Sequence, residues 1–158
     1  MADKRDAIMV AIASAMENIS VANGYNSALG SNVIEWRGKT VTAEGSSLVP
    51  TEESELPALH IRDINDRVIA VDMSGNEDHE LTLEFEVAHE GGATGATMRG
   101  QINDVRKAIG VDPSWGGLAK DLPRELITDT LRFHGERTFF RTLVTKKLTF
   151  STSKYAEE

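Results

Sequence analysis

HELTLEFEV, residues 79–87, decides the fold of this chain, because its apolar and polar residues alternate strictly. The apolar positions are Leu81, Leu83, Phe85 and Val87, and the polar positions are Glu80, Thr82, Glu84 and Glu86. Side chains of a strand point alternately to its two faces, so one face of this stretch is apolar and the other is polar. The pattern predicts a half-buried strand in an antiparallel sheet.

The polar face of this strand carries three carboxylates, Glu80, Glu84 and Glu86. Like charges on one strand face repel one another modestly, so the arrangement does not stabilise the strand by itself. Three interpretations are open. The face lies in solvent, or it lines a channel in which negative charge keeps passing DNA from sticking, or cations on an adjacent strand neutralise it. The second interpretation makes these glutamates candidate lumen-facing residues.

The sequence that precedes this strand begins with an amphipathic helix. Asp3 can cap a helix that starts near Lys4 and stops at Asn23-Gly24. Its apolar stripe consists of Ile8, Ile12, Met16 and Ile19. A short strand is expected at 33–37 and two more at 56–63 and 67–73, separated by a turn at 64–66. Residues 43–55 predict a long flexible loop, which is either an interface element or a simple disordered insertion.

The sequence that follows this strand predicts a second helix over 93–109, with Gly110 at its C′ position. A turn-rich connector at 112–119 follows, and strands at 125–133 and 138–152 are joined by a turn at 134–136. This order lacks βαβ spacing, so the expected class is α+β. We expect one domain over 1–158, with an antiparallel or mixed sheet of about five to six strands and two helices packed on one face.

Composition excludes several classes of function. The chain has 158 residues and no cysteine, which excludes disulfides, thiolate nucleophiles and Cys-ligated zinc. Its formal charge of −8 disfavours tight binding to nucleic acid, which depends on Lys and Arg. The sequence contains no signal-peptide pattern and no apolar run of 18 residues, so we expect a product made in the cytoplasm.

No motif specifies catalysis. The four histidines, His60, His79, His89 and His134, form no HExxH or HxH pattern. No Gly-x-Ser-x-Gly elbow is present, and Gly91-Gly92-x-x-Gly95 is better explained as a strand-to-helix turn. We therefore expect no enzyme and no catalytic, cofactor-binding or metal-binding residues. Of the two tryptophans, Trp115 is expected to anchor its connector to the core, and Trp36 is a candidate subunit contact.

Several stretches, in the same order along the chain, resemble phage and prophage minor tail proteins of the tail-terminator (tail-completion) type. They are Ile19-x-x-Ala22-Asn23-Gly24-Tyr25-Asn26, Glu55-Leu56-Pro57-Ala58-Leu59, the alternating strand from His79 to Glu86, Asp104-Val105-x-x-Ala108-Ile109-Gly110-Val111-Asp112-Pro113-Ser114-Trp115-Gly116-Gly117-Leu118-Ala119, and a closing strand from Lys147 to Tyr155. The sequence departs from the family's pattern at its end, Tyr155-Ala156-Glu157-Glu158, and in the loop at 43–55.

The resemblance implies a structural virion protein without catalytic residues or cofactors. Its partners would be further copies of itself in a ring, commonly a hexamer, the tail-tube protein and the head–tail connector proteins. DNA would pass through the ring without sequence-specific binding, and no membrane is involved. The protein would be made in the cytoplasm of a bacterial host and reside in the virion tail. The alternatives are a head–tail joining (neck) protein, another minor tail protein, and a small ligand-binding or enzymatic domain.

Overall fold

The computed structural model describes residues 3–35, 40–41, 47–48, 56–134 and 138–153 of the chain. Its main sheet has the strand order β1-β4-β5-β7-β6, and a separate two-stranded sheet pairs β2 with β3. The strands are β1 (Val33–Glu35), β2 (Thr40–Val41), β3 (Ser47–Leu48), β4 (Ala58–Val71), β5 (Glu77–Ala88), β6 (Lys120–His134) and β7 (Thr138–Thr152). The helices are α1 (Lys4–Glu17) and α2 (Gly95–Val111), with short 3₁₀ turns at Val21–Asn23 and Leu29–Asn32.

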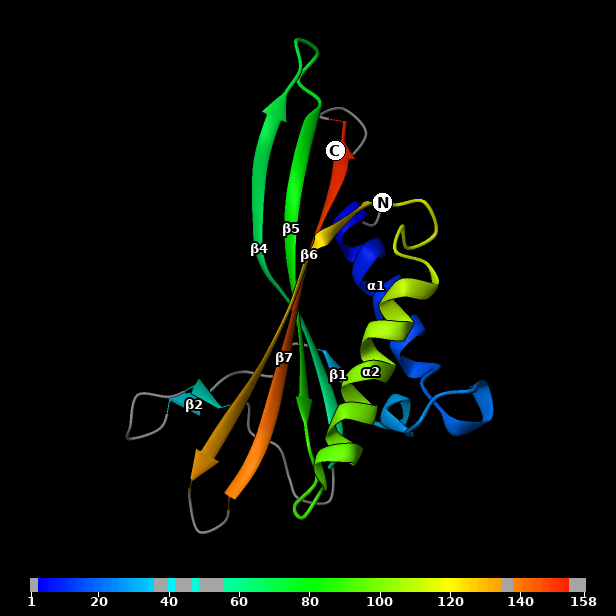
Figure 1. The fold of residues 1–158 in the computed structure, drawn as a ribbon. Coiled ribbons are helices and arrows are strands. Elements are labelled where there is room, and N and C mark those ends of the chain that lie inside the picture. Colours follow the sequence, from blue (N-terminus) through cyan, green and yellow to red (C-terminus); the bar gives the residue numbers. More distant parts are fainter. Residues whose placement is uncertain (1–2, 36–39, 42–46, 49–55, 135–137, 154–158) are drawn as a thin grey trace.

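The expected α+β class is confirmed, but the sheet is mixed. Four long strands, β4, β5, β7 and β6, pair antiparallel, whereas the three-residue β1 runs parallel to β4. Helices α1 and α2 lie together against one face of this twisted sheet (Figure 1). The apolar core lies between them and contains residues from α1, α2, β4, β5 and β7.

Helix α1 forms as its sequence pattern predicts. The Asp3 side chain accepts a hydrogen bond from the Arg5 backbone N–H and so caps the first turn. All four residues of the predicted stripe, Ile8, Ile12, Met16 and Ile19, are buried in the core. The helix ends at Glu17, earlier than expected, and the separate 3₁₀ turn then leads to Gly24, which has a φ of 85°.

The predicted turn at 64–66 is wrong, because β4 runs without a break from Ala58 to Val71. The ladder with β5 only shifts register between Asp63 and Asn65 and again between Val68 and Ala70. The polar residue Asp66 suggested a turn, but its carboxylate instead accepts hydrogen bonds from other elements of the fold. Residues 64–66 thus form part of a strand, although their local sequence resembles a turn, because Asp66 has partners far away in the chain.

Other expected boundaries also change. Helix α2 continues through Gly110 to Val111 and ends where the Asp112 carboxylate accepts hydrogen bonds from the Ser114 and Gly116 N–H groups. Strand β6 begins at Lys120, five residues before the predicted start at 125, whereas β7 has the predicted bounds. Trp115 is buried in the core, as expected of an anchor.

Some predictions fall wholly or partly outside the described residues. Within the predicted loop 43–55, the structure describes Ser47–Leu48, which pairs with Thr40–Val41. The rest of that loop, residues 135–136 of the predicted turn, and Tyr155 lie outside the described part of the chain. Trp36, the candidate subunit contact, lies outside it as well.

Candidate protein-interaction site

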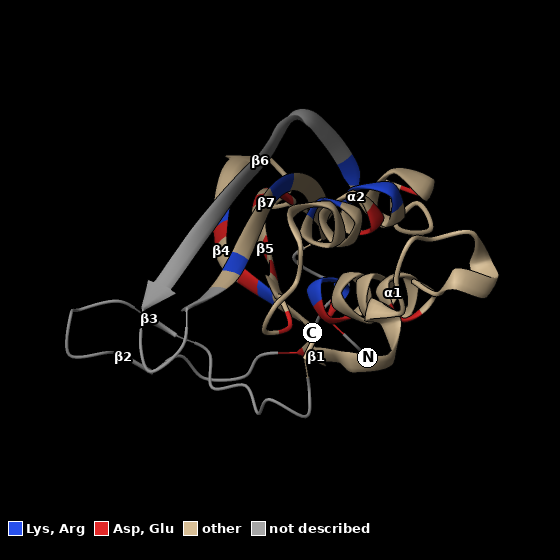
Figure 2. Cartoon of the chain, turned by 60° about the horizontal axis from the view of Figure 1, so that its bottom comes forward, with Lys and Arg blue, Asp and Glu red and all other residues tan. Residues whose placement is uncertain are grey.

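The three glutamates of the polar strand do share one face of β5, the face turned away from α1 and α2. Their apolar neighbours Leu83 and Phe85 point the other way, into the core beneath the helices. The face is not a free acidic surface, however, because basic side chains from the two flanking strands meet it. Figure 2 shows segments of both charges on the strands of this sheet, blue for Lys and Arg and red for Asp and Glu.

Arg62 on β4 is the central cation of this face. It lies opposite Glu84 in the ladder, and its Nε donates to Glu84 Oε1 at 3.1 Å. Both of its terminal nitrogens also lie 3.4 Å from Glu86 Oε2. Arg141 on β7 donates to the same Glu86 oxygen at 3.4 Å. Two arginines and two glutamates therefore form one cluster in which the formal charges cancel.

This cluster is buried, so the interpretation of a face that lies in solvent does not hold for Glu84 and Glu86. Their exposed fractions are 8% and 3%, and that of Arg62 is 1%. Burial lowers the pKa of Arg141, although the neighbouring Glu86 carboxylate opposes that shift. Glu80, nearer the strand end, is partly exposed and pairs with Arg67 at 3.1 Å and with Lys147 at 3.8 Å. Of the three interpretations, the one with neutralising cations on adjacent strands describes this face.

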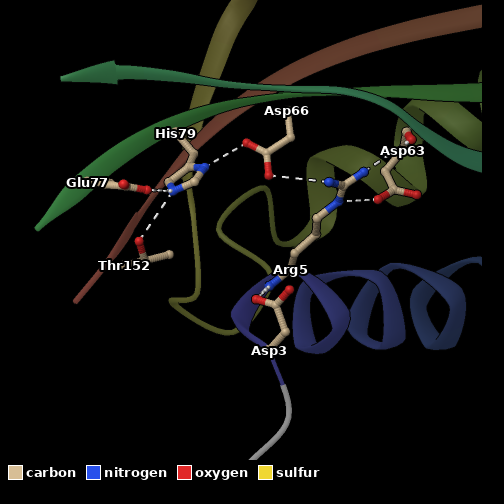
Figure 3. Close-up of polar contacts among 7 residues, drawn as sticks. All are labelled: Asp3, Arg5, Asp63, Asp66, Glu77, His79 and Thr152. Atoms are coloured by element: carbon tan, nitrogen blue, oxygen red, sulfur yellow. Dashed lines mark hydrogen bonds and ion pairs between the residues drawn. The ribbon is translucent and has the colours of Figure 1, made fainter. Parts of the chain in front are cut away.

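A second charged network joins α1 to the upper half of β4 and β5, on the face that the helices cover (Figure 3). The Arg5 guanidinium forms an ion pair with the Asp63 carboxylate through its Nε and a hydrogen bond to Asp66 at 3.3 Å. Asp66 also lies 2.7 Å from Nδ1 of His79 on β5. Because one guanidinium contacts two points of β4 on either side of its register shift, it fixes the direction in which β4 leaves the core.

His79 extends this network to the last strand. Its Nε2 lies 3.2 Å from Thr152 Oγ1 and 3.1 Å from the Glu77 carboxylate. Its ring stacks on Phe150 of β7, with 4.7 Å between the ring centroids. The side chains of α1, β4, β5 and β7 are thus tied together where the β4–β5 hairpin begins to project.

The β4–β5 hairpin carries exposed apolar side chains among its polar residues. The described part of the chain has eight exposed large hydrophobic residues, and five of them belong to this hairpin. They are Ile64, Val68, Ile69, Val71 and Met73. Figure 1 shows the β4–β5 hairpin extending past the ends of both helices. Exposed apolar side chains that lie together on a projecting element are a candidate protein-interaction site.

The turn at the hairpin tip is held by one carboxylate. Asp72 accepts hydrogen bonds from the backbone N–H groups of Ser74 and Asn76, both at 2.9 Å, and from the Asn76 side chain at 2.8 Å. The Asn76 side chain is the main cause that lowers the pKa of Asp72. The tip is thus fixed before any partner binds, and less conformational entropy is lost on association.

His89 forms a separate buried chain of hydrogen bonds. Its Nδ1 lies 2.5 Å from Gln101 Oε1 on α2, and its Nε2 lies 2.9 Å from Thr142 Oγ1 on β7. The Gln101 amide in turn donates to Glu90 at 2.9 Å. Burial lowers the pKa of His89. The neutral ring satisfies both neighbours, one as donor and one as acceptor, so this histidine holds α2 to the sheet.

Two cavities lie beside the helices. One of about 490 Å³ lies where the first turns of α2 face Asn26 and Ser27, and Arg99 is the charged residue in its lining. The buried Asp104 holds this loop by accepting hydrogen bonds from Asn26 and Ser27. A smaller apolar cavity of about 150 Å³ lies beside Trp115. No three His, Cys, Asp or Glu side chains of the described chain are grouped as a metal site requires.

The sequence did not reveal Arg62 and Arg141 as partners of the acidic face. Their positions in the chain carry no local signal, because only the strand register brings Arg62 opposite Glu84. The exposed hairpin residues did carry a signal, since Val68, Ile69, Ala70 and Val71 form a continuous apolar run. Such a run is typical of a strand that is buried on both faces or covered by a partner.

No model of a known protein family matches this sequence, and no curated protein matches it either. Among the described helices, none is both long enough and apolar enough to cross a membrane.

Proposed function

We propose that this chain is a structural subunit of a phage tail that assembles with copies of itself into a ring of the tail-terminator type. In this role it caps the tail tube and joins the tail to the head. The observation that carries the proposal is the exposed apolar surface on the projecting β4–β5 hairpin. The sequence motifs that resemble minor tail proteins supply the setting.

The hairpin supports a role in protein assembly because it is both apolar and prepared for binding. Val71 and Met73 lie at its end, Val71 with 61% of its surface exposed and Met73 fully exposed. The Arg5 network at its base and the Asp72 turn at its tip hold it in one conformation. An element that is ordered before binding binds more tightly, because less conformational entropy is lost when the complex forms.

The charge distribution supports passage of DNA rather than its capture. The chain carries a formal charge of −8, and three of its arginines, Arg62, Arg67 and Arg141, are engaged with glutamates of β5. Phosphate binding needs Lys and Arg side chains that are available to displace counterions. A ring with this balance would let DNA through without holding it.

The proposal is tested by the solution mass of the purified protein, measured by light scattering over a wide concentration range. We expect a discrete closed oligomer, either alone or after addition of tail-tube subunits. A double variant, Val71→Ser with Met73→Ser, is expected to shift the mass towards the monomer. The matched control is Val10→Ser, because Val10 is as exposed as Val71 but lies on α1.

Two results would count against the proposal. A 17.3 kDa monomer at every concentration, with and without tail-tube subunits, would overturn it. Binding to portal-side connector proteins in preference to the tail tube would instead favour the head–tail joining alternative.

A further inference from the structure

Strand β4 has an open outer edge over most of its length. Its neighbour β1 pairs only with Leu59, His60 and Ile61. Beyond this point, residues 62–71 pair with β5 on one side, and no described strand pairs with them on the other. Exposed Ile64, Val68 and Ile69 lie along this segment. A long unpaired edge of this kind presents backbone N–H and C=O groups that another strand can pair with.

The opposite side of the same sheet ends in a second open edge. Strand β6 has 15 residues and is the last strand of the order β1-β4-β5-β7-β6. It pairs with β7, and its ladder is regular from residue 126 to residue 134. The described strands leave its outer edge unpaired. The sheet therefore offers two edge segments of similar length, ten residues on β4 and nine on β6.

We propose that residues 62–71 of β4 in one copy pair with residues 126–134 of β6 in the next copy, so that one sheet continues from subunit to subunit. This inference rests on the proposed function, because it names the contact through which the ring would form. It commits to a second copy of this chain as the occupant of the β4 edge. A head-to-tail contact of this kind closes into a ring when the rotation between copies allows it.

Strand direction supports this pairing. The ladders β4–β5, β5–β7 and β7–β6 are all antiparallel, so β6 runs opposite to β4. When the next copy continues the sheet in the same orientation, its β6 therefore meets β4 antiparallel. Alternating direction is kept all the way round, which is the more stable form of pairing. A contact between two β4 edges would stop at a dimer and leave both β6 edges open.

The offset between the two segments fits a closed, tilted sheet. Through the ladders, residues 62–71 of β4 lie level with residues 145–152 of β7. Residues 126–134 of β6 lie level with residues 138–146 of β7. This is a displacement of about 20 Å along the strands, against a width of about 19 Å for four strands. The two distances imply strands tilted by roughly 45° to the ring axis, close to the tilt of closed barrels.

The strength of such a contact is adequate for assembly. A nine-residue antiparallel overlap supplies about nine backbone hydrogen bonds, close to the number in a typical protein interface. The two register shifts in β4 place Ile64 and Ile69 outside its ladder with β5. Irregularities of this kind restrict the registers in which a neighbouring strand can pair.

The absence of cysteine makes disulfide trapping a clean test. One protein carries Val68→Cys on β4, and a second set carries Thr128→Cys, Thr130→Cys or Arg132→Cys on β6. Mixtures of the two kinds are oxidised and analysed for covalent dimers. We expect covalent dimers in at least one mixture, and none when either protein is oxidised alone. Val10→Cys, on α1, replaces Val68→Cys as the matched control and should not cross-link.

Each outcome separates this inference from the proposed function. An oligomer of discrete mass whose mixtures never cross-link would overturn the edge pairing and leave the ring. Efficient dimers from Val68→Cys alone would show a β4–β4 contact and likewise overturn it. A strictly monomeric protein, with or without tail-tube subunits, would remove both. Thermal unfolding of every single-cysteine protein at the wild-type temperature confirms that the substitutions leave the fold unchanged.

Discussion

Arg62 and Glu84 face each other across β4 and β5 and form an ion pair inside the protein, where only 1% of the Arg62 surface is exposed. Glu80 makes a similar pair with Arg67 further along the same two strands, but the Arg67 side chain is 63% exposed. Of these two Arg–Glu ion pairs between β4 and β5, one is therefore buried and the other lies at the surface. The two environments should give very different energies.

Replacing the buried arginine is the first prediction. We expect Arg62→Ala to lower the free energy of unfolding by about 3–5 kcal/mol, because Glu84 and Glu86 would be left buried with less compensation. The exposed control, Arg67→Ala, should cost less than about 1 kcal/mol. Both values follow from urea unfolding monitored by circular dichroism. Equal losses for the two variants would contradict the burial of the Arg62 cluster.

Arg5 provides the second prediction, because it connects α1 to the base of the hairpin. We expect Arg5→Ala to lower the free energy of unfolding by about 1–2 kcal/mol, a value reduced by the partial exposure of its side chain. Amide hydrogens of residues 64–80 should exchange faster, while those of α2 keep their protection. Lys4→Ala is the control, since Lys4 makes only an exposed hydrogen bond to the Ser151 carbonyl. A uniform increase in exchange over the whole chain would contradict a local role.

The third prediction concerns pH. Burial lowers the pKa of His89 in the folded protein below its usual value of 6.5, so the unfolded chain binds a proton more readily. The stability is therefore complete above about pH 6.5 and falls as the pH drops from there towards the folded pKa, by at most about 1.4 kcal/mol per pH unit.

The measurement for this prediction is the free energy of unfolding at several pH values between 5 and 8, for wild type and for His89→Gln. We expect the variant to have a shallower dependence below pH 6.5, because it lacks the titrating ring. Parallel curves for the two proteins would show that His89 does not contribute.

Gly30 provides the fourth prediction. A Cβ atom built on Gly30 would lie 2.7 Å from the carbonyl carbon of Glu17 and 2.7 Å from the Ile19 oxygen, both backbone atoms. Because backbone cannot give way as a side chain does, Gly30→Ala should cost about 3 kcal/mol or more. The control, Gly110→Ala, has open space around its Cβ in α2 and should stabilise the protein by about 0.5–1 kcal/mol. Thermal unfolding measures both, and a neutral Gly30→Ala would contradict the close approach.

The sequence predicted the elements that form from residues close together in the chain. The helical stripe of Ile8 and Met16 was predicted from its spacing, and β7 was predicted with the bounds that it has. The buried anchor Trp115 was predicted from its place in a glycine-rich connector. In each case the determining residues lie within a few turns or pleats of one another.

Long-range partners explain what could not be predicted. Asp66 resembles a turn residue, and it becomes a strand residue because Arg5, 61 positions away, donates to it. Glu86 resembles a solvated carboxylate, and it is buried because the ladder brings Arg62 and Arg141 to it. Strand register decides both outcomes, and the register is a property of the assembled sheet.

The β4–β5 hairpin gives the molecule a direction, since its tip, which contains Met73, extends past the helices at one end of the strands. In a ring whose subunits all have the same orientation, every such tip emerges on the same rim. The assembly is then polar, with the Met73 tips together on one rim. A single kind of chain would in this way offer different surfaces to two different neighbours, one above the ring and one below.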